Sequence, residues 1–252
     1  EVVGTTFIDD CQWDRSAEYT ITPGKSIVFD GVNGCLSTSE GNFNLSPKVG
    51  TFGDGIYQIY LNIAGGEAYP DPIYFCSSVV PTSAPYNDVR SGYFLAVNPD
   101  IIWLARVDST GTKVSIGGYA ITSNINRNEY YTVVKTGSSI KVYISPTKDF
   151  LSGTLIISTT DGTYTEGYCG FGSGANSGAL LTYREFTVIA ASPDATNGIA
   201  ACIPPIGGGA RYGVEESVYN TFTTENVNKG VYLITARVKT TNPNADEVSL
   251  EY

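Results

Sequence analysis

The chain has 252 residues and a formal net charge of −10, with 15 Lys+Arg against 25 Asp+Glu, and it contains neither His nor Met. The absence of His excludes Ser-His-Asp and Cys-His catalysis and imidazole metal ligands, and the acidic balance argues against nucleic acid as a partner. The longest uninterrupted apolar run, 101–105, is far shorter than the ~20 residues that span a bilayer, so no membrane span is expected.

Only 16% of the residues are charged, against about 25% in a typical domain, so uncharged polar residues and Tyr must form much of the surface. This composition is typical of an extracellular β protein. A chain that starts at Glu1 and not at Met indicates a processed mature form. We therefore expect an extracellular or cell-surface location.

Alternating apolar and polar residues predict β-strands along most of the chain. The clearest early strand covers 56–63, where the odd-numbered residues are apolar and Gln58, Tyr60 and Asn62 stand on the other face. Turn residues separate it from the strands that follow. Those strands are predicted at 93–97, 101–107, 113–116, 130–135, 140–145, 155–159, 168–172 and 180–189. Many short strands at this spacing predict an all-β fold, a two-sheet antiparallel jelly-roll sandwich over 1–190.

The composition changes after residue 190. Pro and Gly crowd 191–213, which predicts a linker, and 214–252 contains two or three strand-like segments. So small a C-terminal β extension must bury its apolar face on its own domain or on another copy. Strand addition between copies would give a homo-oligomer or a filament. The assembly candidates, at both ends of the chain, are Val2, Val3, Phe7, Tyr232, Ile234 and Val238.

The five cysteines include no closely spaced pair, which favours disulfides over a zinc site. Two disulfides and one remaining thiol are ordinary for a secreted chain, and buried thiols are the alternative. The spacing does not fix the pairing. The disulfide candidates are Cys11, Cys35, Cys76, Cys169 and Cys202.

Residues 1–190 resemble the concanavalin A-like lectin/glucanase (laminin-G-like) jelly roll. The matching pieces are Phe7-Ile8-Asp9-Asp10, Asp30-Gly31-Val32, Gly92-Tyr93-Phe94-Leu95, Trp103-Leu104-Ala105-Arg106-Val107, the hairpin 131–144, and 167–174 leading to 183–188. The resemblance implies that the closing strand 183–188 pairs with the opening one. It also implies glycan binding or glycoside hydrolysis as functions of the wider family.

The chain departs from the enzymes of that family. Family glucanases carry their catalytic carboxylates as E-x-D-x-E, whereas the chain has no such spacing and its Glu67, Glu129, Glu166 and Glu185 are isolated. Lectins of the legume type use His in their metal cluster, and His is absent. We therefore expect no enzymatic activity.

A candidate carbohydrate site lies on the polar face of 56–63. Tyr60 can stack on a sugar ring while Gln58 and Asn62 bond its hydroxyls, and Arg106 on a neighbouring predicted strand would add a donor fork. The alternative is an ordinary solvated strand face.

Two weaker signals concern calcium and glycosylation. Asp9, Asp10 and Asp14 can supply oxygen ligands to calcium, with turn capping as the alternative, and no other cofactor is expected. Asn44-Leu45-Ser46 is a formal N-glycosylation sequon, although Pro47 follows it.

Three classes of function remain. The principal prediction is a secreted, non-enzymatic structural or adhesive protein, a subunit of an extracellular filament or surface assembly. The alternative is a carbohydrate-binding, lectin-like module with glycans as partners. A glycoside hydrolase ranks last because the acid pair is missing.

Overall fold

A computed structural model describes residues 6–11, 13–25, 28–30, 35–38, 43–82 and 89–190. All of them belong to the first of the chain's two units, Glu1–Ser217. The expected linker 191–213 and extension 214–252 lie outside the described residues. So do Val2, Val3, Cys202, Tyr232, Ile234 and Val238.

The described part of the chain is all-β, as the alternation predicts. Its strands are β1 (Phe7–Asp9), β2 (Tyr19–Ile21), β3 (Val28–Asp30), β4 (Cys35–Thr38), β5 (Phe43–Pro47), β6 (Gly55–Ser77), β7 (Gly92–Val97), β8 (Ile101–Val107), β9 (Lys113–Ala120), β10 (Asn128–Thr136), β11 (Ser139–Ser145), β12 (Thr154–Thr160) and β13 (Tyr168–Ala190). Two single-turn 3-10 helices, η1 (Ser16–Glu18) and η2 (Phe150–Ser152), complete it. Within these residues no helix is long and apolar enough to cross a membrane.

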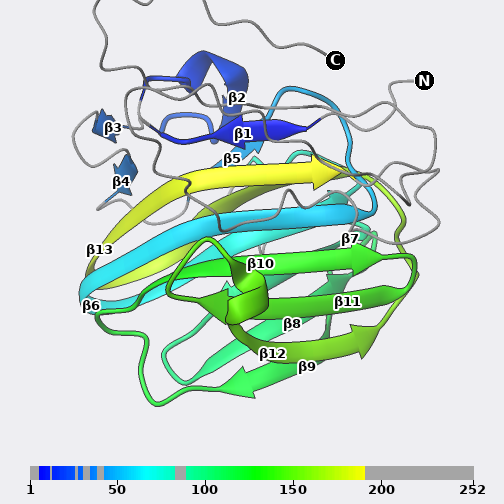
Figure 1. Cartoon of the computed structure of the whole chain (residues 1–252). Coiled ribbons are helices and arrows are strands. Elements are labelled where there is room, and N and C mark those ends of the chain that lie inside the picture. Colours follow the sequence, from blue (N-terminus) through cyan, green and yellow to red (C-terminus); the bar gives the residue numbers. More distant parts are fainter. Residues whose placement is uncertain are drawn as a thin grey trace, which may run out of the picture. The chain divides into compact units, whose positions relative to one another are not determined.

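Two long strands, β6 and β13, hold the sandwich together. They pair antiparallel from Gly55 opposite Ala190 to Ser77 opposite Tyr168, with several register shifts on the way. The first half of β6 and the second half of β13 lie in a front layer with β1, β3, β4, β10, β11 and β12 (Figure 1). Their other halves lie in a back layer with β2, β5, β7, β8 and β9. The result is an antiparallel jelly-roll sandwich.

The main core fills the space between the two layers. Because successive side chains of a strand point to opposite faces, the odd-numbered residues of β6 from Tyr57 to Ile63 all face inward. Tyr131 and Val133 of β10 join them from the same layer, and Leu95 and Leu104 close the core from the back layer.

The opening strand β1 pairs with the closing strand β13, as the resemblance implies. Phe7 lies opposite Val188 and Asp9 opposite Phe186. Phe7 is only 3% exposed, and its ring meets that of Tyr19 edge-on at 5.4 Å. The prediction that Phe7 serves assembly is therefore wrong, because this side chain is part of its own domain's core.

The outward face of the front layer is covered over part of its area. Phe150 of η2 packs on Ile56, Val134, Tyr143 and Ile189 and forms a small separate apolar cluster there. Figure 1 shows η2 in front of this layer. Next to the covered area, the same face carries polar and aromatic side chains.

Candidate functional site

Three neighbouring strands bring a group of polar and aromatic residues together on the outward face of the front layer. Tyr130 and Arg184 both lie opposite Tyr60, and Asn128 lies opposite Asn62. Side chains of directly opposed residues project from the same face of a sheet and contact each other. We call this group, which also includes Glu185, the Tyr60 face. Its members are Tyr60, Asn62, Asn128, Tyr130, Arg184 and Glu185.

An aromatic pair lies at the centre of the Tyr60 face. The rings of Tyr60 and Tyr130 are 4.9 Å apart between centroids and inclined at 63°. The guanidinium carbon of Arg184 lies 5.5 Å from the centroid of Tyr60, which is a cation–π contact. All three side chains are partly exposed. The face therefore offers ring surface to solvent in a fixed orientation.

Hydrogen bonds hold these rings in place. Asn128 Oδ1 accepts hydrogen bonds from the Tyr60 hydroxyl and, at 3.2 Å, from Asn62 Nδ2. The Tyr130 hydroxyl donates to Glu185 Oε1 at 3.1 Å. Burial, followed by the negative charge of Glu185 and this hydrogen bond, raises the pKa of Tyr130, so its phenol is a neutral donor at physiological pH.

One donor on this face lacks an acceptor. The Nε of Arg184 is buried and has no hydrogen-bond partner within the described residues. Most buried donors in folded proteins have a hydrogen-bond partner, so this one is unusual. The outer edge of the face is charged, since Lys148 Nζ lies 3.0 Å from Glu185 Oε2.

The structure brings two of the four predicted sugar-binding residues together. Tyr60 and Asn62 both lie on the Tyr60 face. Gln58 is only 5% exposed. Its Nε2 donates to Thr132 Oγ1 and to the Lys148 carbonyl oxygen, each at 2.9 Å, so the side chain is already engaged within the domain. Its role is to anchor the segment that leads into η2, so its prediction as a sugar ligand is corrected.

The fourth predicted residue, Arg106, lies in the back layer on β8. Its Nη1 donates to Asp161 Oδ2 at 2.8 Å and to Thr163 Oγ1 at 3.1 Å. It does not join Tyr60, because the strand next to β6 in the front layer is β10 and not β8. The expectation that Arg106 adds a donor fork to this site is wrong.

Sequence reasoning missed Asn128, Tyr130, Arg184 and Glu185. Alternation along 130–135 predicts the strand that carries Tyr130, but only the pairing register shows that it stands beside Tyr60. Glu185 has a left-handed φ of 51°, within an irregularity of β13 between Arg184 and Thr187. Sequence alternation does not reveal such a bulge.

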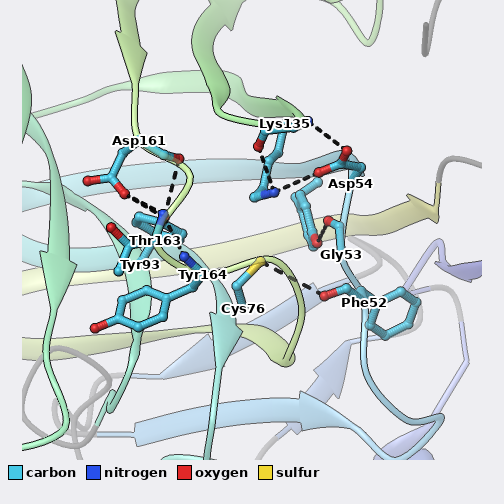
Figure 2. Close-up of polar contacts among 11 residues, drawn as sticks. Phe52, Gly53, Asp54, Cys76, Tyr93, Lys135, Asp161, Thr163 and Tyr164 are labelled. Atoms are coloured by element: carbon cyan, nitrogen blue, oxygen red, sulfur yellow. Dashed lines mark hydrogen bonds and ion pairs between the residues drawn. The ribbon is translucent and has the colours of Figure 1, made fainter. Parts of the chain in front are cut away.

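Figure 2 shows two further sets of polar contacts, one around Asp54 and Lys135 and one around Asp161. The Tyr93 hydroxyl donates to Asp161 Oδ1 at 2.8 Å and accepts from the backbone N–H of Tyr164 at 3.0 Å. Burial raises the pKa of the nearby Cys76 thiol to about 12, despite the positive charge of Lys135. A thiol in that state is a poor nucleophile, so these contacts serve the fold.

Two of the three calcium candidates, Asp9 and Asp14, serve as local hydrogen-bond acceptors. Asp9 is buried and accepts from the Cys11 backbone N–H at 2.8 Å and from the Tyr19 hydroxyl at 2.7 Å. Asp14 accepts from the Ser16 N–H at 2.9 Å, the turn-capping alternative. Within the described ranges, no three acidic or Cys residues form a group that can hold a metal ion. This includes Asp9, Asp10 and Asp14.

The sequon residue Asn44 is fully buried. Its Nδ2 donates to the Pro81 carbonyl at 2.5 Å, so the amide is not accessible in the folded domain. Glycosylation at Asn44 is therefore incompatible with this fold.

The described cysteines are buried. Cys76 and Cys169 are present as thiols in the main core, and Cys11 is 2% exposed. The side chain of Cys35 and all of Cys202 lie outside what the structure describes. That at least one disulfide forms stays a prediction.

Comparisons with known proteins support the fold. No family model matches the sequence, and no curated protein is detectably similar to it. Among solved structures, the carbohydrate-binding module CBM66 from Bacillus subtilis matches 69% of this chain and 96% of its own, with 18% identity and a TM-score of 0.52. The fold is a concanavalin A-like jelly roll.

Two further structures show how widely this fold is used. The Man3GlcNAc-bound exoplasmic/lumenal domain of VIP36 matches 72% of this chain and 87% of its own, with 8% identity and a TM-score of 0.51. The Crh5 transglycosylase in complex with NAG matches 76% and 86%, with 12% identity and a TM-score of 0.53. The fold thus occurs in binding proteins and in enzymes, and at such identities the likeness is one of fold alone.

Proposed function

We propose that the described domain is a carbohydrate-binding, lectin-like module that works outside the cell without enzymatic activity. The observation that carries this proposal is the Tyr60 face, where partly exposed tyrosine rings lie beside amides and a guanidinium. Sugars present apolar C–H faces that stack on aromatic rings and hydroxyls that bond to amides and charged donors. The partly exposed guanidinium of Arg184 supplies donors for sugar oxygens.

The placement of the carboxylates supports binding without hydrolysis. A glycosidase needs two carboxyl groups about 5–9.5 Å apart on either side of one bond. Glu185 lies on the outward face, whereas Glu129 pairs with the inward-facing Leu61 and contacts Arg127 and the Tyr131 hydroxyl. These two carboxylates therefore serve different faces of the sheet.

Glycan binding takes precedence over the filament-subunit prediction. The glycan-binding names among the similar structures favour it, although they describe those proteins alone. Self-association was inferred from apolar residues at the two ends of the chain. Phe7 is buried within its own domain, and the other candidates lie outside the described residues.

The proposal is tested by binding of the purified protein to a panel of immobilised glycans and insoluble polysaccharides. Tyr60→Ala and Tyr130→Ala should each weaken binding at least about tenfold, which corresponds to about 1.4 kcal/mol. Tyr119→Ala is the matched control, since Tyr119 is a 37% exposed tyrosine on β9 of the back layer. It should bind like the wild type.

Arg184→Lys adds a second test of the same face. Lysine keeps the positive charge but loses the planar fork and the Nε donor, so binding should fall although the net charge is unchanged. If folded Tyr60→Ala and Tyr130→Ala proteins bind every retained glycan as tightly as the wild type, the site assignment is wrong. If the wild type retains no glycan, the proposed function itself fails.

A further inference from the structure

Two cysteines that are distant in the sequence lie at neighbouring positions of the paired strands β6 and β13 in the back layer. Tyr168 lies opposite Ser77 and Gly170 lies opposite Tyr74, with a register shift between the two pairs. Cys169 on β13 is therefore opposed by two residues of β6, Phe75 and Cys76, which is the arrangement of a β-bulge.

The bulge turns both sulfur-bearing side chains to the same face. Cys76 has a left-handed φ of 53°, and both Cys76 and its neighbour Phe75 belong to the core between the layers. Cys169 belongs to the same core cluster, and the two thiols are 0% and 1% exposed. The Cys76 Sγ lies 3.9 Å from the Phe52 carbonyl oxygen (Figure 2).

This arrangement is close to that of a disulfide. Opposed side chains of an antiparallel pair have Cβ atoms about 4.5–5.5 Å apart, and a disulfide needs about 3.5–4.5 Å. If the bulge brings the two Cβ atoms about 1 Å closer, their separation falls within the range that a disulfide needs. Cys11, by contrast, lies beyond β1, which pairs with the opposite end of β13.

We propose that Cys76 and Cys169 are a disulfide-forming pair that joins β6 to β13 when the chain folds in the presence of a small-molecule disulfide. One protein thiolate attacks a sulfur of the oxidant RSSR, which releases one RS⁻ and leaves a mixed disulfide. The second protein thiolate attacks the protein sulfur of that bond and releases the second RS⁻. The two thiol protons pass to the released thiolates, so two protein thiols are oxidised and one RSSR becomes two RSH.

The bond must form before the core closes. In the folded domain, burial raises the pKa of both thiols, and the neighbouring thiolate further raises that of Cys169. Thiol–disulfide exchange needs the thiolate, so the folded dithiol exchanges slowly. The proposal is independent of glycan binding, which uses the opposite layer.

Refolding of the full chain in a mixture of reduced and oxidised glutathione tests the pair. After refolding, the protein is unfolded in guanidinium with N-ethylmaleimide and without reductant, digested and mapped by mass spectrometry. We expect a peptide pair linked through Cys76 and Cys169, 2 Da lighter than the sum of the two thiol peptides, and no maleimide on either residue. Full labelling of both cysteines, or a link from either one to another cysteine, would overturn the proposal.

Variants separate this bond from any other pairing. Cys76→Ala and Cys169→Ala should each abolish the linked peptide and the redox dependence of the thermal midpoint, whereas Cys11→Ser and Cys202→Ser should preserve both. If an alanine variant does not fold, the wild-type peptide map still decides. If the wild type has the same thermal midpoint after oxidative and reductive refolding, no disulfide links the two strands.

Discussion

Lys135 is a fully buried lysine whose charge is balanced by one carboxylate. Its Nζ lies 2.6 Å from Asp54 Oδ1 and donates to the Gly137 carbonyl at 3.0 Å. The other oxygen of Asp54 accepts from the Gly137 N–H at 2.6 Å (Figure 2). The ion pair thus fixes the start of β6 to the turn between β10 and β11. Removing one partner of a buried ion pair leaves an uncompensated charge in the core. This lowers the free energy of unfolding by more than the intact pair contributes to it.

Asp54→Asn should therefore destabilise the domain more than the loss of an ordinary ion pair. We expect the free energy of unfolding to fall by about 3 kcal/mol, the low end for a buried pair because the Asp54 side chain is 37% exposed. Urea denaturation measures it. Glu18→Gln, which breaks the exposed Arg15–Glu18 pair, should cost below about 1 kcal/mol. Equal losses in the two variants would contradict the importance of the buried charge.

At Gly170, strand β13 lies so close to its neighbours that only glycine fits without a shift of the backbone. A Cβ added there would overlap the Leu45 carbonyl oxygen of β5 and lie 2.6 Å from the Tyr74 hydroxyl. The obstacle is backbone and cannot move aside as a flexible side chain would. This glycine allows β5 and β13 to pair closely in the back layer.

Gly170→Ala should destabilise the domain by at least about 2–3 kcal/mol, the upper part of the range for an overpacked core. Thermal unfolding followed by circular dichroism gives the change. Gly118→Ala on β9 is the matched control, because its Cβ would meet only the end of the Ile101 side chain, at 3.2 Å. A Gly170→Ala protein as stable as that control would show that β5 is free to shift.

The sequence predicts the simple strands well and the long ones poorly. The predicted strand 101–107 coincides with β8, and 140–145 differs from β11 by one residue. The predicted strand 56–63 is only the first part of β6, and the predictions 168–172 and 180–189 merge into β13. Alternation is lost at the register shifts, where continuous pairing between β6 and β13 maintains the strands.

The site was predictable only in part for the same kind of reason. Alternation along 56–63 places Tyr60 and Asn62 on one face, and the structure confirms this. That Gln58 is covered by the segment near η2, and that Arg106 belongs to the other layer, depends on contacts between residues distant in the sequence. The partners Tyr130 and Arg184 require the pairing register, which the sequence does not contain.

Across the whole domain, tyrosine is used as a core residue. The chain has 18 Tyr, and among the residues that the structure describes six are at most 2% exposed. Burial raises the pKa of each of these phenols, which are Tyr19, Tyr57, Tyr74, Tyr93, Tyr131 and Tyr183. In the unfolded chain the same phenols ionise near pH 10. Their contribution to stability is thus fully present below about pH 10 and is lost as the pH rises above it.

The domain should therefore unfold in alkali through ionisation of its core. Above about pH 10, each buried tyrosine lowers the free energy of unfolding by up to about 1.4 kcal/mol per pH unit. Phenolate absorbance in the near ultraviolet and circular dichroism should change together for these six tyrosines. Ionisation of all 18 Tyr with the fold intact would contradict this.

The pairing of β6 with β13 also decides when the domain can form during synthesis. Residues 55–77 pair with β10 and β7 along one edge, but the partner along their other edge is 168–190, so both layers stay incomplete until the ribosome has released almost the whole jelly roll. The hairpins of β7 with β8 and of β10 with β11 need only nearby residues and can form earlier. Such distant pairing carries a loop-closure cost and is associated with folding in milliseconds to seconds. A nascent chain of this protein therefore exposes the apolar faces of its hairpins until β13 arrives and the two layers can close on each other.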